Sequence, residues 1–261
     1  MKTTGLPDYL VSGNSDTTVF LLHGLFGAKD YWRFHARRLV EQGYRVVAWD
    51  APGYGTSPLP EGLSLPGLAE VQARLIQAVG SKTNIVHGHS MGGQLTPKIY
   101  SLIPDRIAAL VIVATIGYFG NRTPEEQAAF IRERADTGGG AGTEKVVQDM
   151  FAPGASGEEV ELVRRTAGRT PPLTVKAALE AIRTYPEDEA VAAIRGVRVP
   201  TLLVAGGVDK VGHAEGMRRV QAMIEGSELA VVEGSGHYPW AEKPAEFNAH
   251  LSRFLERNAP A

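Results

Sequence analysis

Short apolar runs, separated by long intervals, dominate the distribution of hydrophobic positions along the chain. Each run has the length of a strand, is rich in valine, leucine and isoleucine, and is closely followed by glycine, aspartate or threonine. Six such runs occur, at residues 18–22, 45–49, 84–87, 109–114, 201–205 and 229–233. Unbroken apolar runs are typical of strands that are buried on both faces. The pattern therefore predicts a mostly parallel sheet.

Helical periodicity fills several of the intervals between these runs. Between residues 68 and 79, apolar side chains recur at the spacing of one helix face, and residues 247–255 repeat that pattern after Pro244. This alternation of strands and helices predicts an α/β fold in which helices cover both faces of the sheet.

The alternation stops between about residues 118 and 197, where helical patterns occur without a convincing strand. Thr123 has the features of a helix cap, with Pro124 in the first helical position and Glu126 closing a capping box. We interpret the segment as a helical lid inserted into the core. The predicted division is then a first core part (1–117), the lid or cap (118–197) and a second core part (198–261). The alternative is that the segment simply continues the main domain.

Composition restricts the classes of protein to which the chain can belong. Of its 261 residues, 43% are hydrophobic and 21% are charged, as in an ordinary globular protein. The absence of cysteine excludes disulfides, a thiol nucleophile and a cysteine zinc site. The net charge is −2, without a lysine- or arginine-rich run, so we expect no nucleic-acid partner.

The apolar runs also bear on location. None approaches the roughly 20 residues of a membrane-spanning helix, and residues 1–7 lack the apolar core of a signal peptide. We therefore expect no membrane association and a cytoplasmic location. Monomer and homodimer both stay open.

The most informative segment is the Gly-x-Ser-x-Gly motif formed by Gly88, Ser90 and Gly92. A predicted strand leads into it and a helical pattern leads out of it, which is the setting of a nucleophile elbow. At such a turn, the backbone comes so close that only glycine fits beside the serine. The alternative is an ordinary glycine-rich turn between a strand and a helix.

A serine hydroxyl is a weak nucleophile and needs a base. His237 is the candidate base, because it lies in a glycine-rich loop directly after the last predicted strand. Four other histidines have different interpretations: His87 in the core, His35 and His250 on the surface, and His89 at the variable position of the elbow.

A catalytic histidine needs a carboxylate that orients it. Asp209 follows the strand at 201–205 and is predicted to lie at the same edge of the sheet as His237. A loop-capping role is its alternative. Asp50 also ends a strand, but its turn-rich surroundings favour a structural role. The predicted catalytic group is therefore Ser90, Asp209 and His237.

The tetrahedral intermediate of acyl transfer needs two hydrogen-bond donors for its oxyanion. The backbone N–H of Met91, directly after the serine, is one candidate. The N–H of Leu25, in the segment after the strand at 18–22, is the other. His23 beside it has no second ligand at metal-binding spacing, so we expect neither a metal nor another cofactor.

Together these motifs resemble the α/β-hydrolase family, in its lidded single-domain form. The landmarks are His23-Gly24, Asp50-x-Pro52-Gly53-x-Gly55-x-Ser57, Gly88-x-Ser90-x-Gly92, Gly206 to Asp209, and Gly234 to His237. The resemblance implies a mostly parallel sheet of about eight strands, with an N-terminal hairpin at about residues 8–22. It also implies two-step acyl transfer without a cofactor.

The expected substrate is a small to medium apolar carboxylic ester or lactone. Candidate pocket residues are mostly aromatic or methionine: Phe26, Trp32, Met91, Tyr118, Phe119, Met150, Phe151, His213 and Trp240. Arginines 122, 132 and 134 would suit a carboxylate if the lid turned them inward, and a solvated helix face is the alternative.

Other chemistry on the same fold remains open. Relatives with an aspartate nucleophile are disfavoured, because position 90 is serine. A cofactor-free perhydrolase or haloperoxidase, a carbon–carbon bond hydrolase and a ligand receptor without turnover are the alternatives to an esterase.

Overall fold

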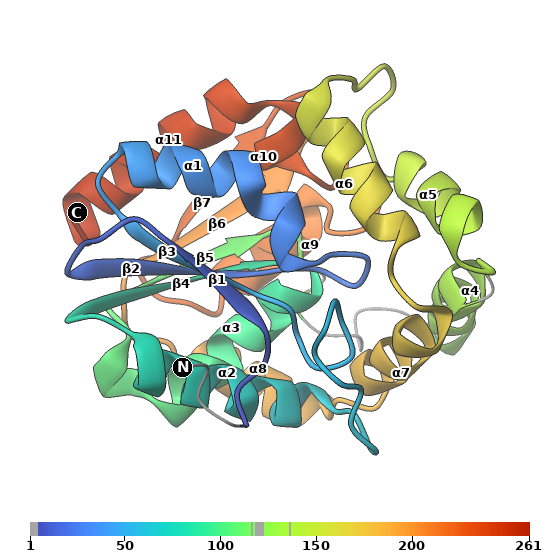
Figure 1. Ribbon diagram of the computed structural model, residues 1–261, viewed down its shortest axis with the longest axis horizontal. Coiled ribbons are helices and arrows are strands. Elements are labelled where there is room, and N and C mark those ends of the chain that lie inside the picture. Colours follow the sequence, from blue (N-terminus) through green and yellow to red (C-terminus); the bar gives the residue numbers. More distant parts are fainter. Residues whose placement is uncertain (1–4, 116, 118–122, 136) are drawn as a thin grey trace.

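A twisted sheet of seven strands forms the centre of the molecule, in the order β1-β3-β2-β4-β5-β6-β7 (Figure 1). The computed structural model describes residues 5–115, 117, 123–135 and 137–261. Strand β1 (Tyr9–Ser12) pairs antiparallel with β3 at the sheet's edge. The others run parallel: β2 (Thr17–Leu22), β3 (Arg45–Trp49), β4 (Thr83–His89), β5 (Ala109–Val113), β6 (Thr201–Gly206) and β7 (Glu228–Val232). The six predicted strands are thus confirmed.

The N-terminal strand corrects one prediction. It does not form a hairpin with β2, because both edges of β2 are occupied by the parallel strands β3 and β4. Strand β1 therefore takes the remaining edge of β3, with Tyr9 opposite Trp49 and Ser12 opposite Val46. The sheet consequently has seven strands among the described residues, rather than the eight that the resemblance implied.

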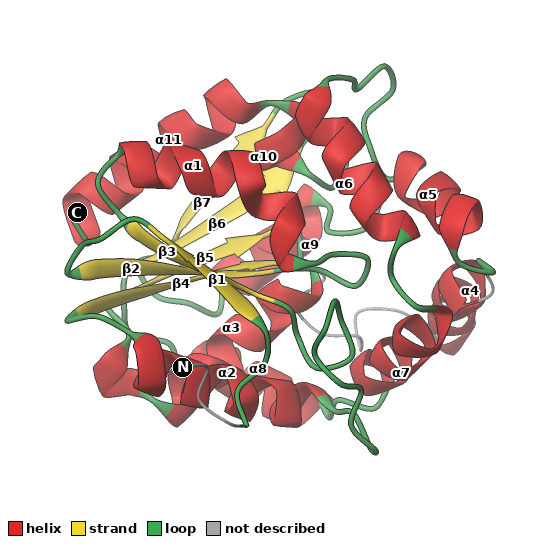
Figure 2. Ribbon diagram, viewed as in Figure 1, coloured by secondary structure: helices red, strands yellow, loops and turns green. Residues whose placement is uncertain are grey.

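Helices cover both faces of this sheet, as predicted (Figure 2). Helices α1 (Arg33–Glu41) and α11 (Pro244–Asn258) lie on one face. The opposite face carries α2 (Leu65–Val79), α3 (Met91–Leu102) and α8 (Glu187–Arg195), and α8 packs against α3. Helix α9 (Ala214–Gln221) contacts β6 and β7. Three short helices complete this part: η1 (Lys29–Trp32), η2 (Pro104–Arg106) and α10 (Pro239–Glu242).

Four further helices lie beyond the carboxyl ends of the parallel strands (Figure 1). These lid helices are α4 (Pro124–Ala135), α5 (Gly140–Gln148), α6 (Glu158–Gly168) and α7 (Pro172–Arg183). The predicted capping box starts α4: Thr123 N donates to Glu126 Oε2 at 2.7 Å, and Glu126 N donates to Thr123 Oγ1 at 3.2 Å. In the part of the chain that the structure describes, no helix is long and apolar enough to cross a membrane.

Two histidines pack against each other inside the core. His87 Nδ1 on β4 lies 3.4 Å from His35 Nε2 on α1, and both side chains are buried. The prediction that His35 lies on the surface is wrong, because this face of α1 packs onto His87 and Phe247. Burial lowers the pKa of His87 to about 3 and, with the nearby His87, lowers the pKa of His35 well below its ordinary value.

These buried rings predict that the fold loses stability in mild acid. His87 stays neutral in the folded protein, whereas an imidazole in the unfolded chain binds a proton below about pH 6.5. The contribution of His87 to the free energy of unfolding is therefore complete above about pH 6.5 and is lost as the pH falls toward 3. For this one residue, the loss between pH 7 and pH 5 amounts to about 2 kcal/mol.

Urea unfolding at both pH values checks this expectation. In His87→Gln and in His87→Leu, the difference in unfolding free energy between pH 7 and pH 5 should shrink by about 2 kcal/mol relative to the unmodified protein. Comparing two pH values for each variant removes the effect of repacking. An unchanged difference in both variants would contradict the assignment of His87 as a neutral core group.

Candidate active site

Ser90 occupies the sharp turn between β4 and α3. Its backbone has φ 53° and ψ −113°, a strained conformation for a residue with a side chain. A Cβ on Gly88 would lie 2.2 Å from Gly92 O, and one on Gly92 would lie 2.4 Å from Leu22 O. The motif glycines are therefore required by backbone contact, and the predicted strand–turn–helix geometry is present.

Asp209 and His237 form a buried pair at the ends of β6 and β7. Asp209 Oδ2 lies 2.9 Å from His237 Nδ1, and Asp209 Oδ1 accepts a hydrogen bond from Val211 N at 2.7 Å. The carboxylate holds the proton of a neutral imidazole on Nδ1, which leaves Nε2 as the nitrogen that accepts a proton. His237 and Ser90 line the same cavity.

His89, the residue before Ser90, connects three loops of the site. Its Nε2 donates to the backbone O of His237 at 2.9 Å, so the neutral ring accepts from Tyr31 Oη at Nδ1, at 3.1 Å. Tyr31 Oη in turn accepts from Gly24 N at 2.9 Å. Burial, with His237 nearby, lowers the pKa of His89 well below its ordinary value. This neutral histidine thus joins the Gly24 loop, the serine turn and the His237 loop, a role that its sequence position did not indicate.

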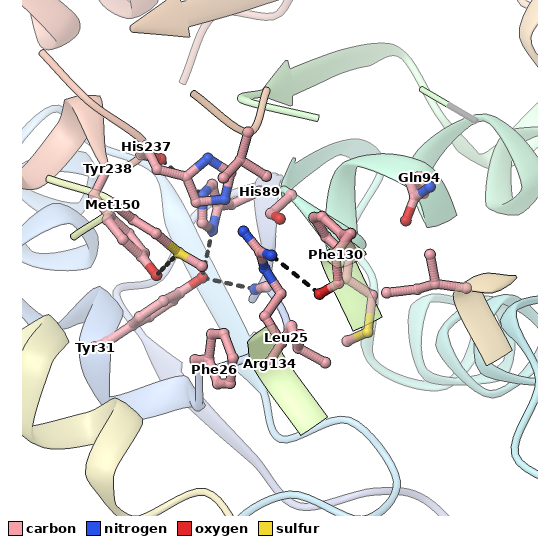
Figure 3. A pocket seen from close by; sticks show the side chains of 16 residues that line it. Leu25, Phe26, Tyr31, His89, Gln94, Phe130, Arg134, Met150, His237 and Tyr238 are labelled. Atoms are coloured by element: carbon pink, nitrogen blue, oxygen red, sulfur yellow. Dashed lines mark hydrogen bonds between the residues drawn. The ribbon is translucent and has the colours of Figure 1, made fainter. Parts of the chain in front are cut away.

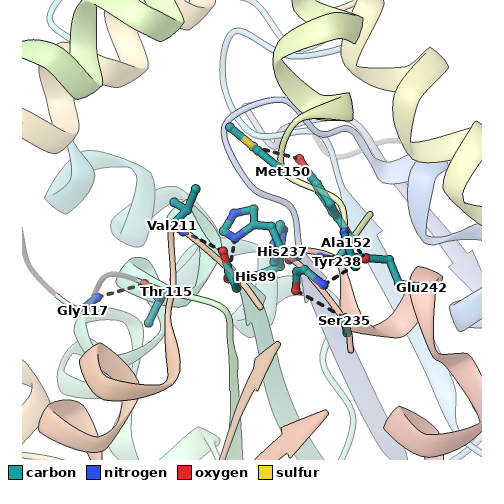
Figure 4. Close-up of polar contacts among 12 residues, drawn as sticks. His89, Thr115, Gly117, Met150, Ala152, Val211, Ser235, His237, Tyr238 and Glu242 are labelled. Carbon is teal, nitrogen blue, oxygen red and sulfur yellow. Dashed lines mark hydrogen bonds and ion pairs between the residues drawn. The ribbon is translucent and has the colours of Figure 1, made fainter. Parts of the chain in front are cut away.

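Glu242 ties the His237 loop to the lid (Figure 4). Its Oε2 accepts from Gly236 N at 2.9 Å and from Ala152 N at 2.7 Å, and its Oε1 accepts from Tyr238 N at 2.9 Å. His237 N also donates to Met150 O at 2.9 Å. The position of His237 therefore depends on the segment that follows lid helix α5.

His23 and Asp50 have structural roles beside the site. His23 Nδ1 donates to Gly24 O at 2.8 Å, and its Nε2 accepts from Ala51 N at 3.0 Å, so both ring nitrogens are occupied. Asp50 is buried, accepts from Lys29 N at 2.8 Å and pairs with the Lys29 ammonium. No group of histidine and acidic side chains suited to a metal occurs among the described residues.

The two backbone segments with predicted oxyanion donors meet at the same place. Leu25 and Met91 both line the cavity that contains Ser90. Met91 is the first residue of α3, where N–H groups have no partner within the helix. A Cβ on Gly24 would lie 3.0 Å from Ser90 Cβ, which shows how closely the Leu25 segment approaches the serine.

The cavity itself is small and largely apolar, with a volume of about 30 Å³ (Figure 3). It adjoins an outer cavity of about 710 Å³, and four residues line both: Phe130, Arg134, Met150 and Val211. Side chains of α4 and α7 therefore lie over Ser90, and a wider space lies outside them. An outer volume of this size is typical of a small-molecule site.

Three of the predicted substrate-binding residues, Phe26, Met91 and Met150, line the inner cavity. Three other candidates, Tyr118, Phe119 and Arg122, lie outside the described residues.

Trp32, Phe151, His213 and Trp240 are absent from both linings, which corrects their prediction. The two tryptophans are buried against each other, with ring centroids 4.5 Å apart. Phe151 packs on Tyr238, and His213 caps α9 by accepting from Gly216 N.

Several lining residues were not predicted from the sequence: Gly24, Gly27, Tyr31, His89, Gln94, Phe130, Ile182, Val211 and Tyr238. Some had a signal in the sequence, since Gln94 lies one helical turn after Ser90, Val211 is two residues after Asp209, and Tyr238 directly follows His237. Phe130 and Ile182 come from lid helices α4 and α7, and only the packing of the lid brings them to Ser90.

The chain is similar to known proteins in both sequence and structure. The profile described as "Alpha/beta hydrolase family" matches residues 19–250. The chain is 30% identical to the dihydrolipoyllysine-residue acetyltransferase component of an acetoin cleaving system from Cupriavidus necator, over 95% of this chain and 66% of that protein. It is 24% identical to an sn-1-specific diacylglycerol lipase from Mus musculus, over 91% of this chain and 80% of that protein. A thermophilic esterase from Thermogutta terrifontis has a similar structure, with a TM-score of 0.80, 23% identity and coverage of 96% and 93% of the two chains.

Proposed function

The chain belongs to the alpha/beta hydrolase family, and on that premise we propose that it is a serine hydrolase of a small to medium apolar carboxylic ester or lactone. The proposal assigns Ser90 as the nucleophile, His237 as the general base and Asp209 as the acid that orients the base. Every group that the reaction needs comes from the chain itself.

One observation carries this proposal: three distant loops converge at one cavity. Ser90 and His237 line that cavity, and Asp209 Oδ2 lies 2.9 Å from His237 Nδ1. The strained serine turn and the buried carboxylate support the same assignment, since both are costly features that a purely structural loop does not require.

The mechanism follows from these assignments. His237 Nε2 takes the proton of the Ser90 hydroxyl while Oγ attacks the carbonyl carbon, and the carbonyl electron pair moves onto oxygen. The N–H groups of Leu25 and Met91 stabilise that oxyanion. When the intermediate collapses, the ester C–O bond breaks and His237 returns the proton to the leaving alcohol. Water then attacks the acyl-enzyme with the same base, which releases the acid and restores Ser90.

The lining supports the choice of substrate class. The lid helices contribute apolar side chains, Phe130 and Ile182, next to Leu25, Phe26 and Met150. These side chains suit an aliphatic acyl chain, because they offer apolar contact and no hydrogen-bond partner.

A panel of substrates tests the proposal. Ethyl and p-nitrophenyl esters of graded acyl length, γ- and δ-lactones, and thioesters are incubated with the purified protein, and acid release is followed by pH-stat. We expect saturable hydrolysis of short to medium esters or lactones. Peroxide-dependent halogenation without ester hydrolysis, or ligand binding without turnover, would contradict it.

The network around His89 predicts a further effect on rate. Tyr31→Phe removes the oxygen that accepts from Gly24 N and donates to His89 Nδ1, and so loosens the segment that presents the Leu25 N–H. We expect kcat to fall about 10-fold with little change in KM, because loss of a whole oxyanion donor costs about 10²- to 10³-fold. The matched control is Tyr54→Phe, since Tyr54 is also buried but its hydroxyl has no hydrogen-bond partner among the described residues. Equal kcat values in the two variants would refute the positioning role of Tyr31.

A further inference from the structure

One polar side chain of the inner cavity takes no part in the proposed chemistry. Gln94 lies on α3, where its backbone N–H donates to Ser90 O at 3.1 Å, so it follows the serine by one helical turn. Its side chain lines the inner cavity, and the residue is only 6% exposed. Among the described residues, none forms a hydrogen bond with its amide group. The amide is therefore available to a molecule that enters the cavity.

Most other polar side chains of this lining are already paired. Five of them have a hydrogen-bond partner within the protein: Tyr31, His89, Arg134, His237 and Tyr238. Of the polar side chains in the lining, only Ser90 and Gln94 have no such partner among the described residues. Buried polar groups are normally paired, because an unpaired group loses its hydrogen bonds to water without replacement. The serine hydroxyl and the Gln94 amide are thus the two polar groups that the fold leaves for a bound molecule.

Gln94 lies on the side of the cavity away from the proposed base. Figure 3 shows His237 and Tyr238 at one end of the lining and Gln94 at the other. In the proposed mechanism, the leaving alcohol takes its proton from His237, so the alcohol part of the ester lies at the His237 end. The acyl chain then extends toward Gln94.

A hydroxyl group is the smallest partner that can pair with both parts of an amide. The amide oxygen accepts a hydrogen bond and the amide nitrogen donates one, and a hydroxyl can do both in return. A carboxylate would leave the amide oxygen unpaired, because it has no hydrogen to donate. The volume of the inner cavity, about 30 Å³, also favours a small group.

From this arrangement we infer that Gln94 is a specificity-determining residue, whose amide hydrogen-bonds a hydroxyl group on the acyl chain. Esters of short hydroxy acids are then preferred over unsubstituted esters of the same length, because an unsubstituted chain leaves the buried amide unpaired. This inference rests on the proposed function, since it takes Ser90 as the nucleophile and His237 as the base that serves the leaving alcohol.

Matched esters test the inference. Ethyl butanoate is compared with the two enantiomers of ethyl 3-hydroxybutanoate, which have equal intrinsic reactivity. In the unmodified protein, kcat/KM for one enantiomer should exceed the values for the other enantiomer and for ethyl butanoate by about 5-fold or more, because a fixed amide reaches the hydroxyl of only one of them. Gln94→Met keeps the length of the side chain but removes the amide, so both preferences should fall below about 2-fold.

Three controls accompany this comparison. Gln72→Met changes a glutamine that is also buried but lies on α2, outside the lining, and should preserve both preferences. Gln94→Leu removes the amide with a side chain of different shape and should behave like Gln94→Met. The third control is 2-hydroxyethyl butanoate, whose hydroxyl is on the alcohol part, and Gln94→Met should change its kcat/KM no more than that of ethyl butanoate.

Three results would overturn the inference. The first is an unmodified protein without either preference. The second is a pair of Gln94 variants that retain both preferences, since the selection would then come from the shape of the cavity. The third is an equal loss of activity toward all the esters in both variants, which would show that the amide only supports the fold.

Ligand binding separates this inference from the proposed hydrolysis. Pentan-2-one and 4-hydroxypentan-2-one have carbon in place of the ester oxygen and otherwise match the acyl chains of the two esters. In NMR titrations of the unmodified protein, the hydroxy ketone should bind with a Kd lower by about 5-fold or more, and Gln94→Met should abolish this difference whereas Gln72→Met keeps it.

The outcomes of this titration are distinct from those of the rate measurements. If the difference in Kd is found but no ester is hydrolysed, the proposed function fails and the hydroxyl site stands. If the two ketones bind the unmodified protein equally, if neither binds, or if Gln94→Met retains the difference, the hydroxyl site is refuted whether or not esters are hydrolysed.

Discussion

Replacing Ser90 by alanine should lower kcat/KM for the best ester substrate by roughly 10⁴- to 10⁶-fold. In the proposed mechanism, the change removes the oxygen that would form the acyl-enzyme, and only the contributions of the oxyanion donors and of substrate binding would remain. The fold should remain intact, because alanine keeps the Cβ at this turn and the backbone bond from Ser90 N to Val113 O.

The control for this experiment is Ser101→Ala, which removes an exposed serine from α3, the helix that follows Ser90. Initial rates and circular dichroism spectra are measured for both variants and compared with those of the unmodified protein. Activity of Ser90→Ala within 10-fold of the unmodified protein would contradict the assignment of Ser90 as the nucleophile.

Asp209→Asn should be nearly as damaging, with kcat reduced about 10³- to 10⁴-fold. An asparagine oxygen can still accept from Val211 N, so the loop should keep its shape. The amide nitrogen would then face His237 Nδ1 and donate to it. That hydrogen bond would place the imidazole proton on Nε2, where the base must be free to receive the proton of Ser90.

The kinetic signature distinguishes this effect from misfolding. KM should change only a few-fold, and the exposed-residue control Asp105→Asn should behave like the unmodified protein. A kcat for Asp209→Asn within 10-fold of the unmodified value would show that Asp209 only caps its loop.

The sequence was sufficient to predict the strands and the serine turn, because these features depend on residues that are close together in the chain. Buried strands are recognisable as apolar runs, and Gly88 is required by its close contact with Gly92 within the serine turn. Asp209 and His237 could be predicted because parallel strands present their following loops at one edge of the sheet. These features are encoded within about ten residues each.

Features that depend on the choice of packing partner were predicted poorly. The pattern at residues 9–12 shows no preference between β2 and β3, and only the occupied edges of β2 decide the pairing. Trp32 and Trp240 are aromatic residues near the catalytic loops, as pocket residues are, yet they bury each other. For Arg134, the composition of α4 does not reveal which side of the helix faces the serine.

The location of a covalent adduct tests the central claim most directly. Diethyl p-nitrophenyl phosphate reacts with activated serines, and peptide mass spectrometry identifies the residue that receives the diethylphosphoryl group. We predict one group per chain, on the Ser90 hydroxyl, with activity lost in step with labelling and no labelling of Ser90→Ala. An adduct on another residue that accompanies the loss of activity, or full activity in protein labelled at Ser90, would contradict the account.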